Sequence, residues 1–343
     1  MSKTPILSYT PKALAQKLVE EGFKSFNASQ IFDWVYRKKE LDFLEMTNLP
    51  QTLRGFLDEH YSIDLLHEII RQTSEDGTVK FLFSLQDGFA IESVLMTHEY
   101  GLSLCVTSQV GCSMGCTFCA SGLKKRTRNL EVFELVSQIL TVEHLLQVKI
   151  SHVVVMGTGE PFDNYDNVIN FIKIINDNMG LAIGQRHITV STCGIVPRIY
   201  QYAEEPIRSN LAIRLHAPND ALRTSLMPIN KRYPLAEVIE ACKVYFDKTS
   251  RRVTFEYILL GGVNDSISQA DELSDLLRGL NAYVNLIPYN PVSEFDHQKT
   301  DPETASRFFD RLIKRGIVAT LRREQGGDID AACGQLRMKS ERK

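Results

Sequence analysis

The sequence has no apolar run that approaches the roughly 18 residues needed to cross a bilayer, and its first residues lack the charged-then-apolar pattern of a secretion signal. These absences predict a cytoplasmic protein without a membrane segment. We also find no low-complexity linker and no internal repeat. Only 1 residue is tryptophan, and the formal net charge is a modest −3, so no excess of one sign points to an oppositely charged partner for the whole chain.

The composition is that of a folded globular protein. Hydrophobic residues make up 43% of the chain and charged residues 24%, which is too apolar for a disordered polymer. A length of 343 residues allows one large α/β domain or two to three smaller ones. The net charge hides two basic regions: residues 307–343 carry ten Lys or Arg against five Asp or Glu, and residues 124–128 read Lys-Lys-Arg-Thr-Arg. Either region alone is most simply solvated surface charge, and a polyanion would be held by such local patches.

Residues 1–95 are expected to form a small helical domain that ends in a β-hairpin. Apolar residues recur at helical spacing between residues 11 and 61. Two β-type runs follow, at 78–85 and 90–96, joined by an Asp-Gly pair that is a strong hairpin signal. Trp34 and Tyr36 stand beside three basic residues and are candidate contacts for RNA bases, although a buried helix face is the more common origin of such a stripe.

From residue 96 to 325 the pattern changes to strands that alternate with helices. The strands are rich in Val, Ile and Leu, which is typical of sheets buried on both faces, and the alternation predicts a parallel sheet with right-handed crossovers. Six strand–helix units predict an α/β fold of the partial (β/α)6 barrel type rather than the closed eight-unit form. The expected strands are 102–108, 152–157, 187–192, 210–215, 253–259, 283–287 and 317–321, and the expected helices lie near 131–147, 165–178, 197–204, 236–249, 267–279 and 302–315. Residues 326–343 are expected to form a C-terminal loop or tail.

Residues able to do chemistry recur directly after these expected strands. In parallel α/β sheets the reactive residues lie beyond the carboxyl ends of the strands. Because the same placement repeats along the chain, the pattern indicates an enzyme. The residues and segments concerned are Cys112, 157–160, Ser191, His216 and Asn290.

Four of the seven cysteines lie between residues 105 and 119, and Cys112, Cys116 and Cys119 have the spacing C-x3-C-x2-C. Thiols this close indicate a metal or an iron–sulfur cluster rather than a disulfide framework. A structural zinc site normally needs a fourth protein ligand, and no histidine lies at finger-like spacing. A cubane cluster on three cysteines leaves one iron open to a small ligand. A zinc knuckle remains the alternative at this point.

The cysteine motif, placed after the first strand of a partial barrel, resembles the radical S-adenosylmethionine superfamily. Phe118 before the third cysteine and the segment 157–161 (Gly-Thr-Gly-Glu-Pro) fit the same pattern. The resemblance implies a 4Fe–4S cluster on Cys112, Cys116 and Cys119. It also implies that the open iron binds S-adenosylmethionine, which the reduced cluster splits to a 5′-deoxyadenosyl radical. Glycine lets the backbone approach such a ligand closely.

Further segments are more specific, and together they resemble the RlmN-type adenine-C2 RNA methyltransferases, close relatives of the Cfr-type C8 enzymes. The likeness runs in order from about residue 10 to 340. The segments are 191–194 (Ser-Thr-Cys-Gly), 215–219 (Leu-His-Ala-Pro-Asn), 226–230 (Leu-Met-Pro-Ile-Asn), 262–265 (Gly-Val-Asn-Asp), 285–291 (Asn-Leu-Ile-Pro-Tyr-Asn-Pro) and 327–336 (Gly-Asp-Ile-Asp-Ala-Ala-Cys-Gly-Gln-Leu).

This resemblance implies roles for three reactive residues. Cys333 would be methylated by a first S-adenosylmethionine, and a second molecule would supply the radical that takes a hydrogen from that S-methyl group. The resulting methylene radical would add to C2 of adenine. Glu92, 13 residues before Cys105, would remove the C2 proton, and Cys105 would attack the Cys333 sulfur to release methylated RNA and leave a disulfide. Without the resemblance, Cys105 would be taken for an inert buried cysteine and Glu92 for a solvated glutamate.

Elementary chemistry supports the same scheme. Adenine C2 is electrophilic and carries no acidic proton, so addition of a radical is a workable route. A thioether donates hydrogen readily because sulfur stabilises the adjacent radical. Release of the product then needs a second thiolate at sulfur and a base for the proton.

The resemblance also implies a set of S-adenosylmethionine contacts. The chain departs from the family pattern at Thr158, where methionine is more usual, and at Cys193 and Arg214, where serine is common. Cys193 and Cys242 are assigned as structural. The implied contacts are Gly159, Glu160, Ser191, Arg214, Leu215, His216 and Asn290.

The implied substrate is an adenosine of 23S rRNA in the peptidyl-transferase centre, and for some members also the adenosine 3′ of the tRNA anticodon. The resemblance therefore makes residues 1–95 an expected RNA-binding accessory domain, with the two basic regions as further candidate RNA contacts. The cluster requires an electron donor of the flavodoxin type, and a monomer is the simplest expectation. Two alternatives stay open: a Cfr-type adenine-C8 methyltransferase and a non-catalytic, zinc-stabilised RNA-binding protein. Glu160-Pro161 and Ile287-Pro288 favour the C2 enzymes over the C8 enzymes.

Overall fold

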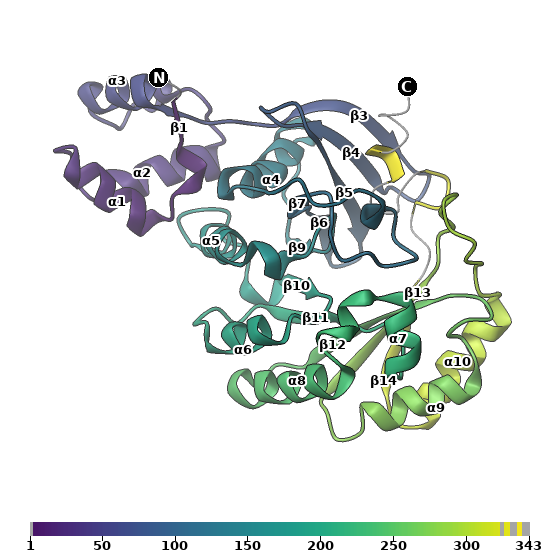
Figure 1. Cartoon of the computed structure of the whole chain (residues 1–343). Coiled ribbons are helices and arrows are strands. Elements are labelled where there is room, and N and C mark those ends of the chain that lie inside the picture. Colours follow the sequence, from purple (N-terminus) through teal and green to yellow (C-terminus); the bar gives the residue numbers. More distant parts are fainter. Residues whose placement is uncertain (1–2, 323–325, 330–334, 338–343) are drawn as a thin grey trace.

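Parallel strands that follow one another along the chain form the centre of the molecule (Figure 1). The computed structural model describes residues 3–322, 326–329 and 335–337. Each parallel strand pairs with the next one in sequence, which gives an open, partial barrel and confirms the predicted fold class. These strands are β6 (Gly101–Cys105), β9 (His152–Val155), β10 (Ile188–Thr192), β11 (Asn210–Arg214), β12 (Val253–Leu259), β13 (Ala282–Pro288) and β14 (Val318–Leu321).

Three antiparallel strands extend the same sheet beyond β6. They are β5 (Ala90–His98), β4 (Val79–Ser84) and β3 (His67–Thr73), and β5 pairs directly with β6. The predicted hairpin is therefore confirmed as β4–β5. Strand pairing joins this hairpin to the barrel sheet, although the sequence led us to group it with the helical segment. The sequence did not predict strand β3, because none of its residues is buried and most of them are polar, so it lacks an apolar run.

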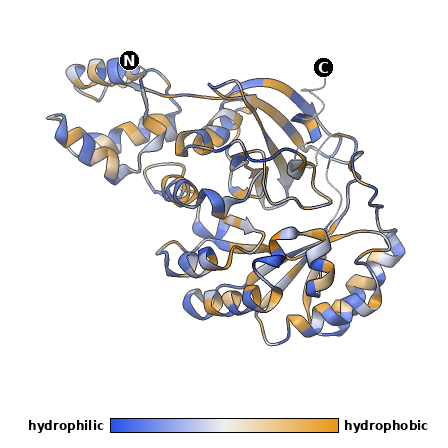
Figure 2. Ribbon diagram, in the orientation of Figure 1, coloured by the Kyte–Doolittle hydropathy of each residue, from blue (hydrophilic) through white to orange (hydrophobic). Residues whose placement is uncertain are grey.

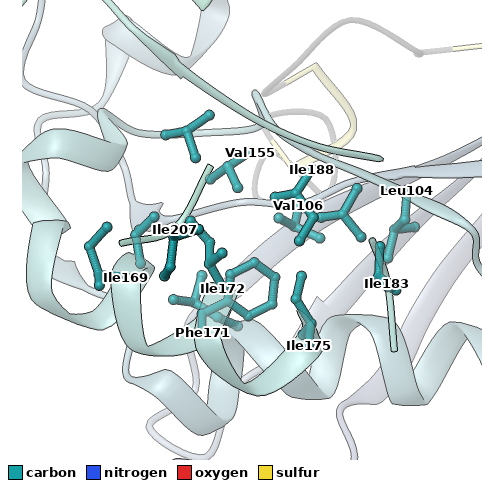
Figure 3. Packing of buried hydrophobic residues seen from close by; sticks show 14 of the residues in the cluster. Leu104, Val106, Val155, Ile169, Phe171, Ile172, Ile175, Ile183, Ile188 and Ile207 are labelled. Atoms are coloured by element: carbon teal, nitrogen blue, oxygen red, sulfur yellow. The ribbon is translucent and has the colours of Figure 1, made fainter. Parts of the chain in front are cut away.

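Helices cover the outer face of the barrel strands. Figure 3 shows Phe171, Ile172 and Ile175 of α5 packed against strand residues such as Leu104, Val155 and Ile188. The hydropathy colours of Figure 2 alternate around the outer helices, as expected for elements that bury one side. The helices are α4 (Val132–Leu146), α5 (Tyr165–Asn176), α6 (Val196–Glu204), α7 (Asp220–Leu226), α8 (Leu235–Thr249), α9 (Ile267–Leu276) and α10 (Pro302–Lys314), of which only α7 was not expected.

The N-terminal helices lie at one end of the molecule, next to α4 (Figure 1). They are α1 (Pro11–Glu20), α2 (Asn27–Phe32), which continues as a π-helical turn over Asp33–Lys38, and α3 (Gln51–His60), with a small pairing of β1 (Thr4–Pro5) and β2 (Tyr61–Ser62). Helix α1 begins with the Thr10 hydroxyl accepting the Ala13 N–H, and Pro11 occupies the first turn.

Two of the basic residues beside Trp34 attach these helices to the barrel. The Arg37 guanidinium donates to the Asn178 carbonyl. Lys39 Nζ donates to the Val148 carbonyl at 3.1 Å and lies 3.1 Å from the Glu143 carboxylate. Arg37 and Lys39 therefore hold the helical segment against the barrel in this structure.

Short elements complete the chain. Strands β7 (Gln109–Val110) and β8 (Arg128–Asn129) pair beside the cysteine loop. Single 3-10 turns occupy Ile6–Ser8, Phe43–Glu45, Ala120–Leu123, Pro161–Asn164, Gln185–His187 and Pro228–Lys231. Within the described ranges, no helix has the length and apolar character needed to span a membrane.

Candidate active site

A cavity of about 760 Å³ lies inside the partial barrel and reaches the carboxyl ends of its strands. Its wall combines strand residues from β5, β6 and β9–β13 with the cysteine loop and the loop after β13. Of the predicted site residues, nine contribute to this wall: Cys105, Cys112, Cys116, Cys119, Gly159, Ser191, Arg214, His216 and Asn290. One cavity thus gathers residues that are up to 185 positions apart.

The three motif cysteines lie on a tightly folded loop. The Cys112 N–H donates to the Lys124 carbonyl at 3.0 Å, which holds the loop against the basic segment that follows it. Gly111 has φ +81°, and a Cβ there would lie 2.3 Å from the Lys125 carbonyl oxygen, so this turn requires glycine. Burial raises the pKa of the Cys112 thiol to about 11 and also raises the pKa of Cys116. Thiols in such surroundings ionise when a metal binds them.

In the part of the chain that the structure describes, no three His, Cys, Asp or Glu side chains converge on a position for a single metal ion. The three sulfurs line a shared wall of the cavity instead. A cubane cluster takes one thiolate on each of three irons, so this donor set fits a cluster.

The Gly-rich segment after β9 packs closely against the end of β6. The Gly157 N–H donates to the Val106 carbonyl at 3.0 Å, and the Thr158 carbonyl accepts from the N–H groups of Ser108 and Gln109. Gly159 has φ +112°, and a Cβ there would lie 2.7 Å from Gln109 Cβ. The glycines therefore allow two backbone segments to meet at the cavity wall.

Glu160 lies behind that wall, fully buried. Its Oε1 accepts the Phe162 N–H at 3.1 Å and its Oε2 accepts the Cys193 N–H at 2.9 Å. Arg214 Nη1 lies 3.9 Å from Oε2. In this arrangement Glu160 organises the loops after β9 and β10, and its predicted contact with S-adenosylmethionine remains a prediction. Leu215 is also buried in the core and does not reach the cavity.

Arg214 and Asn290 both line the cavity, and each buries one polar atom that has no hydrogen-bond partner among the residues that the structure describes. Arg214 Nε donates to Ser191 Oγ at 3.2 Å and Nη1 donates to the Gly159 carbonyl at 3.1 Å, whereas Nη2 is buried with no hydrogen-bond partner. Asn290 Oδ1 is likewise buried without a partner. Buried polar atoms of this kind carry an energetic penalty unless a ligand satisfies them. A zwitterionic amino acid head group would supply both an acceptor and a donor.

His216 follows β11 in a left-handed conformation, with φ +58°. Its Nδ1 accepts the Ile258 N–H at 3.1 Å, and its ring meets Phe118 edge-on at 4.9 Å. Burial, together with the nearby guanidinium groups of Arg214 and Arg223, lowers the pKa of His216 to about 3. The ring is therefore neutral, and because Nδ1 accepts a bond, the proton is on Nε2.

Cys105 ends β6 and faces the cavity among apolar side chains, in a cluster with Val94, Met96, Val154 and Met156. Val94 of β5 lies directly opposite Cys105. Glu92 is two residues before Val94, so it lies on the same face of β5. Its side chain is buried: Oε1 accepts the Arg337 N–H at 2.7 Å, and Oε2 lies 3.0 Å from Lys80 Nζ.

Cys333 lies outside the described residues, but the segments on both sides of it are described. On one side, the Asp328 carboxylate accepts from Ser74 and from the Glu75 N–H, and the Gly326 N–H donates to Asp76. On the other side, Gln335 Nε2 donates to the Pro291 carbonyl at 3.2 Å. The tail is thus attached to the β3–β4 turn and to the loop after β13.

Three polar residues that organise this site were not singled out from the sequence. Arg223, fully buried, donates to the carbonyls of Leu215, Cys193 and Arg214. Asn264 donates to the His216 carbonyl at 2.8 Å, which gives the Asn of the Gly-Val-Asn-Asp segment a structural role. Lys80 pairs with Glu92. The only sequence signal for Lys80 was a lysine inside an otherwise apolar strand.

The chain matches two family models. The model for the radical SAM superfamily matches residues 106–273, and the model for the ribosomal RNA large subunit methyltransferase N-terminal domain matches residues 4–63.

Full-length relatives agree with these matches. A probable dual-specificity RNA methyltransferase RlmN of Spiroplasma citri is 54% identical over 98% of both chains. The protein with the same description from Geobacillus thermodenitrificans is 55% identical over 98% of this chain and 93% of its own. Among solved structures, a radical SAM methyltransferase from Sphaerobacter thermophilus superposes with a TM-score of 0.92 at 44% identity, covering 97% of this chain and 98% of its own.

Proposed function

Because the chain belongs to the RlmN family of radical S-adenosylmethionine RNA methyltransferases, we propose that it methylates C2 of an adenosine in the peptidyl-transferase centre of 23S rRNA. We propose the adenosine 3′ of the anticodon in tRNA as a second substrate, because the relatives are described as having dual specificity. The observation that carries the proposal is the shared cavity: the three motif cysteines and Cys105 line it, and the tail is attached beside it.

Cys112, Cys116 and Cys119 would hold a 4Fe–4S cluster. The unpartnered Arg214 Nη2 and Asn290 Oδ1 would bind the amino acid part of S-adenosylmethionine, with the ring of His216 and the Gly159 backbone beside them. When bound, the cluster and S-adenosylmethionine would supply the radical that takes a hydrogen atom from the S-methyl group. The protein around them excludes water and holds the reacting groups in place.

Two cysteines would carry the methyl group and release the product. Cys333 would accept the methyl group from one S-adenosylmethionine, and its methyl carbon would become bonded to C2 of adenine after a second molecule is consumed. The thiolate of Cys105 would then attack the Cys333 sulfur, so that a sulfur–sulfur bond forms and the sulfur–carbon bond to the RNA breaks. The departing carbon would keep the electron pair of that bond and take up a proton, for which protonated Glu92 is the nearby donor, to become the methyl group. The apolar surroundings of Cys105 keep competing nucleophiles away from this step.

Glu92 would accept the C2 proton before release. Its position on the cavity side of β5, one step along the strand from the residue opposite Cys105, supports this role. The same proposal includes an electron donor of the flavodoxin type, because the cluster must be reduced. It also includes a cytoplasmic location, because both RNA substrates are cytoplasmic, and a monomer as the simplest assembly.

Nucleoside analysis tests the proposal. The anaerobically reconstituted protein, given S-adenosylmethionine, a reductant and unmethylated 23S rRNA fragments or tRNA, should produce 2-methyladenosine measured by mass spectrometry. Cys105→Ala should accumulate a covalent protein–RNA adduct, because the bond to Cys333 cannot be resolved. Cys242→Ala is the matched control: this cysteine is buried in α8, away from the cavity wall, so the variant should turn over like the parent. Formation of 8-methyladenosine, or normal turnover by Cys105→Ala, would refute the scheme.

A further inference from the structure

Lys80 is a fully buried lysine in strand β4. Its side chain has an exposed fraction of 0% and its strand neighbours are Phe81, Leu82 and Phe83. Lysine is almost never fully buried unless its charge is paired. Here Nζ lies 3.0 Å from Oε2 of Glu92, whose side chain is 4% exposed. The two side chains therefore form an ion pair inside the protein.

The strand register places this pair beside the reactive thiol. Lys80 lies opposite Val94 across β4 and β5, and Val94 lies opposite Cys105 across β5 and β6. Residues opposite one another in an antiparallel pair share a face of the sheet. Lys80, Val94 and Cys105 thus form one row across three strands, and Glu92 stands one step along the same face.

The two oxygens of Glu92 have partners of different kinds. Oε2 faces Lys80, which belongs to the sheet, whereas Oε1 accepts the N–H of Arg337, which belongs to the tail that carries Cys333. One oxygen is consequently held by the rigid part of the fold. The other is held by the backbone of a C-terminal segment 245 residues away.

Stability alone does not explain the pair. Replacing a buried ion pair by apolar side chains of similar volume is often neutral or stabilising, because desolvating two charges costs more than their attraction returns. A role of the Glu92 carboxylate in the reaction explains a buried charge pair next to the cavity better than stability does.

We propose that Lys80 is a positioning residue for the methylation of RNA, an inference that rests on the proposed function. In the step concerned, the C2–H bond of the covalent protein–RNA adduct breaks, its proton forms a bond to Oε1 of Glu92, and the electron pair of the C–H bond stays in the adenine ring. The unpaired electron that radical addition leaves in that ring would pass to the iron–sulfur cluster, which would serve as the one-electron acceptor. The Lys80 ammonium fixes Oε2 and balances the negative charge, so that Oε1 is the oxygen directed at the proton.

The test separates the two half-reactions in the anaerobic holoenzyme. In Lys80→Met, methylation of Cys333, followed by mass spectrometry of the protein, should proceed as in the parent. Methylation of RNA should slow by roughly ten- to a hundredfold, within the range of general-base effects. RNA deuterated at adenosine C2 should then react more slowly than normal RNA, because proton removal has become rate-limiting. Lys80→Arg should recover part of the rate.

Lys39→Met is the matched control, because it also separates a lysine from a buried glutamate, at 3.1 Å, far from the cavity. It should show no new isotope effect. A Lys80→Met protein that methylates Cys333 and RNA equally slowly, or that shows no isotope effect, overturns the proposal.

A second variant covers failure of Lys80→Met to fold. Lys80→Met combined with Glu92→Gln removes both charges of the pair together, and it should methylate RNA as slowly as Glu92→Gln alone. If the double variant methylates RNA more slowly than Glu92→Gln alone, Lys80 acts through a group other than Glu92, which contradicts the proposal. Failure of the proposed function itself looks different, since the parent would then yield neither methylated Cys333 nor 2-methyladenosine.

Discussion

At the scale of single residues, the site depends on buried polar groups whose partners lie in other elements. His216 illustrates this: its ring accepts an N–H from β12, its carbonyl accepts from Asn264, and its backbone adopts a left-handed conformation. Outside glycine such a conformation is uncommon and persists where the surrounding structure enforces it. The bond to Nδ1 requires a neutral ring, and the bond to the carbonyl holds the backbone in place, which suits a donor at the wall of a ligand cavity.

The low pKa of His216 predicts a dependence of stability on pH. The unfolded imidazole takes up a proton near pH 6.5, whereas the folded one does so only near pH 3. Between these values the unfolded state binds more protons, so stability falls as the pH is lowered from about 6.5. The slope approaches about 1.4 kcal/mol per pH unit once the unfolded group is mostly protonated. Denaturant unfolding of the parent and of His216→Gln between pH 7 and 5 measures it. Parallel pH profiles for the two proteins would contradict the assignment.

At the scale of elements, the short helix α7 is hydrogen-bonded to the carboxyl ends of two barrel strands. Arg223 projects from α7 and donates to the carbonyls of Cys193, after β10, and of Arg214 and Leu215, at the end of β11. Its fourth partner is the Asn230 side chain, at 2.8 Å. Those carbonyls belong to the segments that carry the cavity wall, so α7 sets the spacing between β10 and β11 where ligands would bind.

We expect Arg223→Met to destabilise the fold strongly, because it leaves several buried carbonyl groups without a donor. The loss should be about 2–5 kcal/mol, because each buried carbonyl left without a donor costs about 1–3 kcal/mol. The midpoint of denaturant unfolding measures it. Arg315→Met provides the comparison: Arg315 pairs with Asp271 and Asp275 on the surface, and its loss should amount to about 0–1 kcal/mol. Similar losses for both variants would show that the α7 contact is unimportant.

At the scale of the whole molecule, many basic residues are paired within the protein. Arg126 and Arg128 of the basic loop pair with Asp163, Asp87 and Glu134. In the C-terminal region, Arg311 and Arg315 pair with acids of α9. Fewer cations are therefore available for phosphates than the composition suggests. Lys125 is exposed on the loop that the cysteine motif packs against, at the side of the cavity.

Measurements of RNA binding should distinguish basic residues that are paired within the protein from exposed ones such as Lys125. Lys125→Ala should weaken binding and reduce the steepness of the salt dependence by about one ion. Arg128→Met should leave the salt dependence unchanged, because Arg128 already pairs with Glu134 at 2.7 Å. Fluorescence anisotropy of labelled RNA at several salt concentrations measures both. A reduced slope for Arg128→Met with none for Lys125→Ala would reverse the assignment.

Much of the fold could be predicted because its signals are local. Each barrel strand is an apolar run and each helix has an apolar stripe, so periodicity alone placed the strands β6 and β9–β14 close to their observed bounds. Helix α7 was missed because it has only 7 residues, too few for a clear period. The cysteine spacing and the glycine-rich segment are likewise local, and they suffice to indicate the family.

The sequence by itself thus determined the order of strands and helices, the cysteine motif and the family, because neighbouring residues encode them. Only the tertiary structure decided that Glu160 accepts the N–H groups of Phe162 and Cys193, that Arg37 and Lys39 attach the helical segment, and that Lys80 meets Glu92. The pairing of Lys80 with Glu92 follows from the register of two antiparallel strands, and the Arg337 contact joins residues 245 positions apart. Contacts of that kind depend on how separate elements pack, which no local spacing specifies.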